Sequence, residues 1–469
     1  RRRSPTPAAA DALKAERTSP HEGSGISSPA PRRLAPVRAA RTLNTAWTQH
    51  AHFAALDWAS DHHDLIVLDR QGAALAEFRF AHSAAGWAEF TDKMKPFAGC
   101  PLTLETSSGP AVDQLLQRGF TLYPLAPLAA AGYRQRKVPS GTKTDRHDTW
   151  AMADALRTDG HAWRVLRPQD EATALLRALC RDEISLIEQR TLLVNQLQAA
   201  LREYYPAALE VFADWTVPSP WAFLQQFPTP VALQTAGKKK WETFLHTHQL
   251  WRPQTRDQRL ALCAAANALP ASAAVVSAKS LLAVSLAKVL VTLPHQIDQY
   301  RQRIVAAFRA HPDHDIFGGL PGAKDVLAPR LLAELGSVRE EYPDADALLC
   351  QAGVSPVSYQ SGKIERCRLR RAGVKPLRFT VPLWANASRA TCAWAQAYYE
   401  QKREEGHSHA SALRCLGKRW LKILWRLWQS KERSDESKHL RSLERRGAKV
   451  WEKIKMALVP AAETEPGTG

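Results

Sequence analysis

Short apolar runs separated by polar turns dominate the chain from residue 52 to about 124 and predict alternating strands and helices. Strand-like alternation comes first, in three consecutive runs over 52–58, 63–69 and 73–80. The runs that follow switch between helix-like and strand-like patterns, over 84–97, 101–105, 110–118 and 121–124. We therefore expect an α/β domain over residues 50–165.

Four acidic residues stand at the ends of these predicted elements. Asp57 ends the first apolar run, and Glu105 ends the run over 101–105. Asp145 and Asp148 are three residues apart at the start of a helical stretch, so their side chains share one face. Two strand ends and one helix face can gather four carboxylates around divalent cations. Such hard oxygen ligands suit Mg²⁺ or Mn²⁺, and a two-metal site suits attack on a phosphodiester.

Other acidic residues offer alternatives to this quartet. Only Asp57 directly ends an apolar run, whereas the nearby candidates Asp61, Asp64 and Asp69, and Asp154 on the helix, lie elsewhere in the pattern. Scattered surface carboxylates are the competing interpretation, because the chain carries 46 acidic residues. Lys143 and Arg146, beside the helix start, would offset carboxylate repulsion or contact phosphate.

The order of three consecutive strands followed by alternating helix and strand is that of an RNase H-like fold. The remainder of the chain has a helical period instead. Leucines at three-and-four spacing predict one long helix over 170–204, and a second arm is expected over about 274–309. An intramolecular helical hairpin and a dimerising coiled coil both fit this pattern. The segment 206–292 is expected to hold a helical insertion, within a coiled-coil region spanning 170–310.

Residues 312–430 predict a mainly helical C-terminal domain with one basic loop. The sequence Leu320-Pro321-Gly322-Ala323, followed by an apolar helix, is similar to half of a helix-hairpin-helix, which presents backbone N–H groups to a phosphate. Lys324 replaces the usual second glycine. We expect a disordered basic tail over 1–45 and a charged flexible tail over 432–469.

The charge of the chain indicates a polyanionic partner. The formal net charge is +18, and nucleic acid is the leading candidate. A membrane surface is the alternative, but we find no uninterrupted apolar run near the roughly 20 residues of a spanning helix. The seven cysteines are far apart and fit a reducing cytoplasm rather than a disulfide framework. No glycine-rich nucleotide loop is present, which argues against ATP dependence.

The basic loop contains a second candidate site. Ser361 precedes Gly362 and can lie on an exposed turn with a free hydroxyl, while dense guanidinium charge nearby would bind a phosphodiester and stabilise its transition state. A plain Ser-Gly turn in a basic loop is the competing interpretation. The basic residues of the loop are Lys363, Arg366, Arg368, Arg370 and Arg371. A one-signed stripe near the C-terminus is expected to contact phosphate as well, through Arg414, Lys418, Lys422 and Arg426.

Several motifs together resemble the insertion-sequence-110 family of transposases. The N-terminal motifs are Ala55-Leu56-Asp57, Leu104-Glu105-Thr106-Ser107 and Lys143-Thr144-Asp145-Arg146-His147-Asp148, similar to that family's DEDD domain, which is itself RuvC-like. The C-terminal motifs resemble the family's second domain, also named after elements 116 and 902: Leu320-Pro321-Gly322, Leu332-Ala333-Glu334-Leu335-Gly336, Ala352-Gly353-Val354-Ser355-Pro356 and Gln360-Ser361-Gly362-Lys363. The two matches cover about 50–205 and 295–430.

The resemblance implies a DNA transposase that cuts and rejoins strands. It implies that Asp57, Glu105, Asp145 and Asp148 bind Mg²⁺ or Mn²⁺, and that Ser361 is the nucleophile. It further implies a noncoding guide RNA, an active site shared between protomers of a dimer or tetramer, and a bacterial cytoplasmic, nucleoid-associated location. Two alternatives remain open: a RuvC-like structure-selective endonuclease that uses metal-activated water, and a non-catalytic nucleic-acid-binding protein.

Overall fold

The computed structural model describes residues 47–137, 140, 142, 144–253, 255, 257, 259, 261, 271–362 and 364–458. The basic tail expected over 1–45 lies outside these residues, as do Lys143 and Lys363. Two compact units divide the chain, one up to Leu166 and the other from Arg167 onward.

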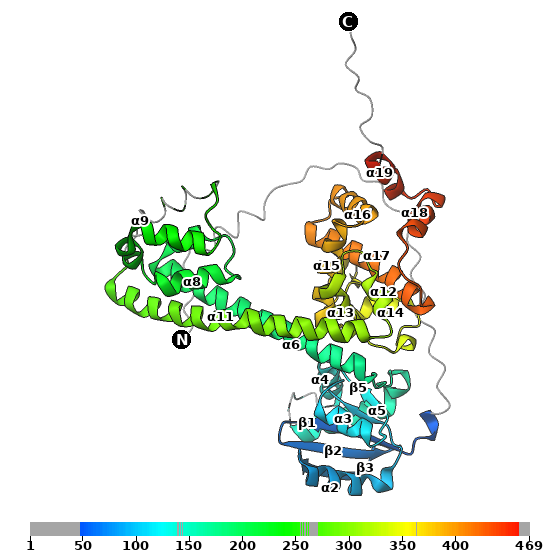
Figure 1. Ribbon diagram of the computed structural model, residues 1–469. Helices are drawn as coiled ribbons and strands as arrows, with labels where there is room; N and C mark the ends of the chain where they lie inside the picture. The colour runs from blue at the N-terminus through cyan, green and yellow to red at the C-terminus, as the bar shows by residue number, and fades with distance from the viewer. Residues whose placement is uncertain are drawn as a thin grey trace. The chain divides into compact units, whose positions relative to one another are not determined.

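The first unit contains a five-stranded mixed sheet in the order β3-β2-β1-β4-β5 (Figure 1). Strands β1 and β2 are antiparallel, as are β2 and β3, whereas β4 and β5 run parallel to β1. The predicted α/β unit is confirmed. The strands are β1 (His52–Trp58), β2 (His62–Asp69), β3 (Ala74–Ala81), β4 (Leu102–Leu104) and β5 (Leu122–Pro124).

Strand alternation divides the sheet into two buried faces. Leu56 and Leu65 pack with helices α2 (Ala84–Met94) and α3 (Pro110–Gln117) on one face. Ala55, Ile66 and Leu68 pack on the other face, in a cluster with side chains of helices α4 (Pro127–Lys137) and α5 (Asp145–Asp159). Successive side chains of a strand point to opposite faces, so each strand supplies both layers.

The helix expected over 84–97 is α only to Met94, and a 3₁₀ turn, Lys95–Phe97, follows where Pro96 has no N–H to donate. Further 3₁₀ turns are Trp47–Gln49 and Gly160–Ala162.

The second unit begins with an antiparallel pair of long helices, α6 (Glu171–Tyr204) and α11 (Ala273–Ala310). Residues near the start of α6 pack with residues near the end of α11, and the reverse holds at the other end of the pair. This is the intramolecular hairpin, one of the two arrangements that the leucine spacing predicted. The insertion between its arms contains α7 (Pro206–Val211), α8 (Pro218–Gln226) and α9 (Pro230–Thr247), which pack around Trp221 and Trp241.

Helix α11 is long and apolar, but Lys279 and Lys288 interrupt it, so the prediction that no uninterrupted apolar run approaches about 20 residues stands. By length and composition this helix could cross a membrane: its most apolar 18-residue window has a mean hydropathy of 1.8, and 22% of that window is buried. A single helix of this kind is weak evidence for a membrane protein. Here its buried side chains, such as Leu286 and Leu290, pack with α6 and the insertion.

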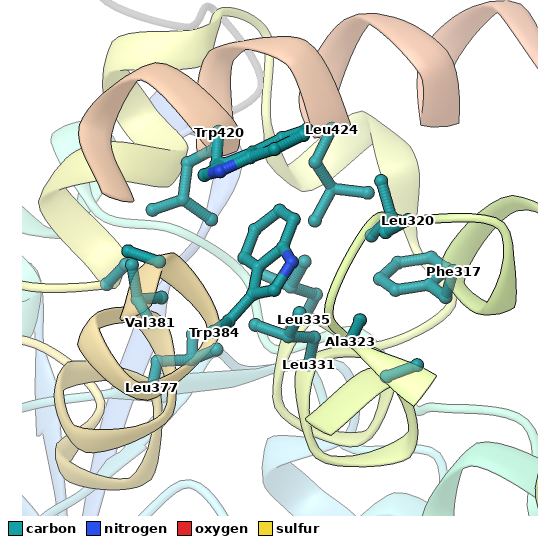
Figure 2. Close-up of a cluster of buried hydrophobic side chains, with 14 of the residues drawn as sticks. Phe317, Leu320, Ala323, Leu331, Leu335, Leu377, Val381, Trp384, Trp420 and Leu424 are labelled. Carbon is teal, nitrogen blue, oxygen red and sulfur yellow. The ribbon is translucent and has the colours of Figure 1, made fainter. Parts of the chain in front are cut away.

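The C-terminal core lies where α13 (Lys324–Leu335), α15 (Lys375–Arg389) and α17 (His409–Ser430) meet (Figure 2). Trp384 and Trp420 are fully buried at its centre. Their indole N–H groups donate to the Pro321 carbonyl oxygen at 3.0 Å and to the Ser388 Oγ at 2.8 Å, which removes the cost of burying them unpaired. The remaining elements are α12 (His314–Gly318), the 3₁₀ turn Arg339–Glu341, α14 (Ala345–Gln351) and α16 (Ala393–Glu404).

The turn before α13 is held tightly. Gly322 has a φ of +75°, and a Cβ at this position would lie 2.5 Å from the Ser388 backbone nitrogen. Lys324 also adopts a positive φ, +45°, which is strained for a residue with a side chain. The unusual lysine therefore stands at a position where backbone geometry favours glycine.

Two parts of the second unit differ from expectation. The basic loop contains an antiparallel hairpin of β6 (Val357–Ser361) and β7 (Ile364–Arg368). The expected flexible tail instead continues as helices α18 (Glu436–Arg445) and α19 (Lys449–Leu458). High charge concealed their amphipathic pattern, because Leu443, Val450 and Ile454 join the buried core.

Candidate active-site residues

Asp57 and Glu105 lie at neighbouring strand ends. Leu56 of β1 is paired with Leu104 of β4 in parallel register, and each acidic residue comes directly after its leucine. Asp57 shares the face of β1 that carries Ala55, which is the face covered by α5. These two residues therefore lie at the ends of adjacent parallel strands, as predicted, and Asp57 is on the face that α5 covers.

Asp145 and Asp148 occupy the first turn of α5. Thr144 caps this helix, because its side-chain oxygen accepts a hydrogen bond from the His147 backbone N–H at 3.1 Å. The positive end of the helix dipole stabilises carboxylates at this position. The Asp145 side chain is largely exposed, whereas Asp148 is buried.

The pKa of Asp57 reflects both its burial and its acidic neighbours. Burial raises the pKa of Asp57, and the nearby charges of Glu105, Asp145 and Asp148 raise it further, to about 6. Asp64, directly opposite Asp57 on β2, adds a smaller effect in the same direction. Glu105, Asp145 and Asp148 are thus close enough to Asp57 for their charges to act on it. A negative potential at a strand end is the kind of environment that attracts a cation.

Two arginines balance part of this charge. Arg134 of α4 contacts Asp148 at 2.7 Å, and Arg79 of β3 lies 2.8 Å from Asp64 and 3.5 Å from Asp145. Neither arginine was identified from the sequence, since neither is near the acidic residues along the chain. Arg146, predicted to contact phosphate, instead pairs with Glu77 at 2.8 Å, with its side chain mostly exposed.

The alternative acidic residues have structural roles. Asp154 pairs with Lys137 at 2.7 Å and with Arg157 at 2.5 Å. Burial alone would raise the pKa of Asp154, but these two hydrogen bonds lower it overall. Asp69 accepts two backbone hydrogen bonds within its turn, and the Asp61 carbonyl oxygen accepts one from the His82 backbone N–H. Asp64 is already paired with Arg79 on both of its oxygens.

The oxygen ligands and the excess negative charge of the quartet suit a divalent cation, but the side chains would have to rearrange to bind one. Within the described residues, no group of three or more His, Cys, Asp or Glu side chains is arranged to coordinate a metal ion. Asp145 and Asp148 are held by their arginines, so these ion pairs must open before both carboxylates can turn toward a shared ion.

Ser361 lies at the tip of the β6–β7 hairpin. It is the last residue of β6, it is paired with Ile364, and only two residues connect the strands. Gly362, the first of them, has a φ of +55°, which tight hairpin turns require. All described residues of both strands are exposed, so the Ser361 hydroxyl is accessible, as predicted.

The register places two arginines on the same face of the hairpin as Ser361. Arg366 is paired with Tyr359 and Arg368 with Val357, and these residues share a side with Ser361 by strand alternation. The Arg368 guanidinium lies 4.2 Å from the centre of the Tyr359 ring. Ser358, Gln360, Glu365 and Cys367 occupy the opposite face. Arg370, outside the hairpin, is engaged with the Ser355 carbonyl oxygen at 3.2 Å, and the Arg371 carbonyl oxygen accepts from Arg378.

The basic stripe on α17 divides into two parts. Arg414 and Lys418 are half-buried, whereas Lys422 and Arg426 are exposed and line a cavity beside α18. Lys422 also lies 3.4 Å from Asp346. The stripe is thus not one uniform surface, because only Lys422 and Arg426 line the cavity.

Comparison with known proteins identifies relatives over most of the chain. Residues 54–206 match the model of the DEDD domain of IS110-type elements, described as a transposase, and residues 314–400 match the model described as "Transposase IS116/IS110/IS902 family". A "Mini-circle putative transposase for IS117" of Streptomyces coelicolor is 31% identical over 82% of this chain and 96% of its own length. The "Insertion element IS900 uncharacterized 42 kDa protein" of Mycobacterium paratuberculosis is 29% identical over 80% of this chain and 94% of its own. A "Putative transposase y4uE" of Sinorhizobium fredii is 32% identical over 36% of this chain and 51% of its own.

Proposed function

We propose, from the premise that this chain belongs to the IS110 family of transposases, that it cuts and rejoins DNA through Ser361. The chain is a transposase of an insertion element. The finer chemistry is our proposal: a serine nucleophile, a divalent cation at the quartet, a noncoding guide RNA and a homo-oligomeric assembly in the bacterial cytoplasm, associated with the nucleoid. An RNase H-like, RuvC-type fold for the first unit belongs to the same proposal, and the strand order β3-β2-β1-β4-β5 supports it.

The exposed face of the hairpin is the observation that carries the proposal. The Ser361 oxygen would attack the phosphorus of the scissile phosphodiester, forming a phosphoserine bond while one DNA oxygen leaves and takes up a proton. Arg366 and Arg368, on the same face, would stabilise the negative charge that develops on the phosphate. A hydroxyl from another DNA end would then displace Ser361. One ester bond replaces another at each step, so rejoining needs no ATP.

Asp57, Glu105, Asp145 and Asp148 would hold Mg²⁺ or Mn²⁺. The bound cation would supply charge neutralisation at the phosphate. Asp57, whose pKa is raised by burial and then by its carboxylate neighbours, would gain the most from cation binding. In the absence of the cation, the positive charges of Arg79 and Arg134 would reduce the repulsion among the carboxylates.

Ser361→Ala tests the proposal, and Ser358→Ala is its matched control. Both serines are exposed on β6, but they lie on opposite faces. With DNA carrying the ends of the element and RNA that copurifies with the protein, wild type and Ser358→Ala should form a covalent protein–DNA adduct that survives denaturing detergent. Ser361→Ala should form none.

Two results would contradict the proposal in different ways. An adduct formed by Ser361→Ala would assign the nucleophile to another residue. Cleavage without an adduct in both wild type and Ser361→Ala would favour a resolvase-type nuclease. Such a nuclease would need only the quartet, all of which lies in the first unit.

A further inference from the structure

A cavity of about 610 Å³ lies in the second unit between α17, α18 and the segment that joins them. One wall comes from α17, where Arg419, Lys422 and Arg426 follow the spacing of one helical face. His439 and Ser442 of α18 form part of the opposite wall. The volume is in the range of pockets that bind small molecules or single nucleotides. The acidic quartet and Ser361 are not among its lining residues.

The rim of the cavity is strongly basic. Seven lysine and arginine side chains line it, against three carboxylates: Arg419, Lys422, Arg426, Arg433, Lys438, Arg445 and Arg446, against Glu432, Asp435 and Glu436. The carboxylates are partly committed, since Glu432 pairs with Lys438 at 3.0 Å and Glu436 accepts from the Cys392 thiol at 3.1 Å. Arg426 and Arg445 have no carboxylate partner among the residues the structure describes, so their charges are available to an anion.

The interior of the cavity is apolar. Trp394, Ile423 and Leu427 line it, and the His439 ring centre lies 4.7 Å from that of Trp394. His439 Nε2 is buried in this wall and has no hydrogen-bond partner within the described part of the chain. Burial, followed by the charges of Arg419 and Arg446, lowers the pKa of His439. The interior thus presents aromatic and aliphatic surface, with the His439 ring as part of one wall.

We propose that this cavity holds one nucleotide of a single-stranded nucleic acid, with its base inside and its phosphate groups on Arg426 and Arg445. Aromatic and aliphatic surface for a base, and a cationic rim for its phosphates, are the complements of one nucleotide of a strand. A base within a duplex cannot enter without unpairing, so a single-stranded stretch is the appropriate ligand. The proposal rests on the nucleic-acid partner of the proposed function and is independent of the chemistry of Ser361 and the quartet.

Ser442→Trp tests the cavity without changing charge. Ser442 lines the hollow, so an indole there would fill it, whereas Ser437→Trp places the same side chain on an exposed position of α18 outside the lining. With full-length protein and a fluorescent single-stranded oligonucleotide of mixed sequence, we expect Ser442→Trp to weaken binding by about tenfold. Ser437→Trp should change it by less than about twofold.

A second pair of variants keeps the test decisive if the added indole disturbs folding. Arg426→Gln with Arg445→Gln removes two rim charges, and Arg441→Gln with Lys449→Gln removes two exposed charges outside the lining. The rim pair should weaken binding of the oligonucleotide several-fold more than the control pair. Equal losses from both pairs, or wild-type binding by a folded Ser442→Trp protein, would overturn the proposal.

Further probes identify the source of the nucleotide. A mixture of the four nucleoside monophosphates that competes only at concentrations far above the oligonucleotide supports a strand as the ligand. Competition at equal concentration assigns the cavity to a free nucleotide instead. If an abasic oligonucleotide of the same length binds as tightly as the intact one, the cavity does not take a base and the proposal fails. Because these assays measure binding alone, they can fail while adduct formation by Ser361 succeeds, and the reverse.

Discussion

Neighbouring charges, in addition to burial, distinguish the aspartates of the first unit from one another. Asp154 is the more buried, yet Lys137 and Arg157 lower its pKa overall. Asp57 is only half-buried, but the strongest charges acting on it are carboxylates, and its pKa is raised. An aspartate paired with lysine and arginine side chains stabilises the fold. An aspartate placed among other carboxylates destabilises it, because like charges repel. Such a cost is typical of functional sites.

His63 provides a pH prediction for the same unit. The residue is fully buried beside Phe80 and Trp87, and its Nε2 lies 2.8 Å from His82 Nδ1. Burial, followed by the charges of His82 and His62, lowers its pKa from 6.5 to about 4. Between these values the unfolded chain binds a proton that the folded chain does not. The free energy of unfolding should therefore fall as the pH drops from 6.5 to 4, by of order 2 kcal/mol.

Substitution isolates this contribution. His63→Leu should flatten the dependence of the melting temperature of the first unit on pH over this range. His62→Leu, at the less buried neighbouring position of β2, should retain most of it. An unchanged slope in His63→Leu would show that another group is responsible.

At the scale of elements, the register of the β6–β7 hairpin makes Arg366 a diagonal neighbour of Ser361 on one face. Arg366→Gln should slow adduct formation in a single turnover by about 10²-fold, because a charge-stabilising donor would be lost from the transition state. Arg371→Gln removes an equal charge from an exposed residue outside the hairpin and should affect DNA affinity more than rate. Equal rate losses in the two variants would mean that only net charge matters.

A buried ion-pair network joins the helical hairpin to the C-terminal core. Glu183 of α6 is 2% exposed and contacts Arg330 of α13 at 2.7 Å and Arg301 of α11 at 3.0 Å. Glu183→Ala would leave the nearly buried Arg330 charge unpaired, so the free energy of unfolding in urea should fall by about 3 kcal/mol.

Two further variants test this explanation of the network. Glu188→Ala, at an exposed position of the same helix, should stay within about 0.5 kcal/mol of wild type. Glu183→Leu combined with Arg330→Leu should recover much of the loss, because no buried charge remains. A double variant as unstable as Glu183→Ala would contradict the ion-pair explanation.

Periodicity in the sequence predicted the strongly apolar elements, but it missed the highly charged helices α18 and α19 and the exposed β6–β7 hairpin. The strand ends at Asp57 and Glu105 follow apolar runs, so their positions could be inferred. The β6–β7 hairpin has no buried face, and the alternation of Val357 and Tyr359 with polar residues is too short to identify a strand. Arg79 and Arg134 could not be inferred, because their contacts with the acids depend on strand register and on the packing of α4.

At the scale of the whole molecule, the two candidate chemistries belong to different compact units. The quartet lies entirely before Leu166, and Ser361 lies after Arg167. An effect that originates at the quartet should therefore appear in the first unit and leave the local stability of the second unchanged. This separation allows cation binding to be tested without DNA, RNA or turnover.

Hydrogen exchange in the presence of Mg²⁺ or Mn²⁺ provides that test. A cation at about ten times its dissociation constant should stabilise the first unit by about 1.4 kcal/mol and slow exchange in β1 and β4 by about tenfold. Asp57→Asn should abolish the effect, and it should also stabilise the cation-free unit at neutral pH, since it removes a carboxylate from beside three others. Asp113→Asn on α3, an exposed residue remote from α5 across the sheet, is the control and should respond as wild type. Equal protection in Asp57→Asn and wild type would place the cation elsewhere, and unchanged exchange in wild type would remove the metal from the proposed chemistry.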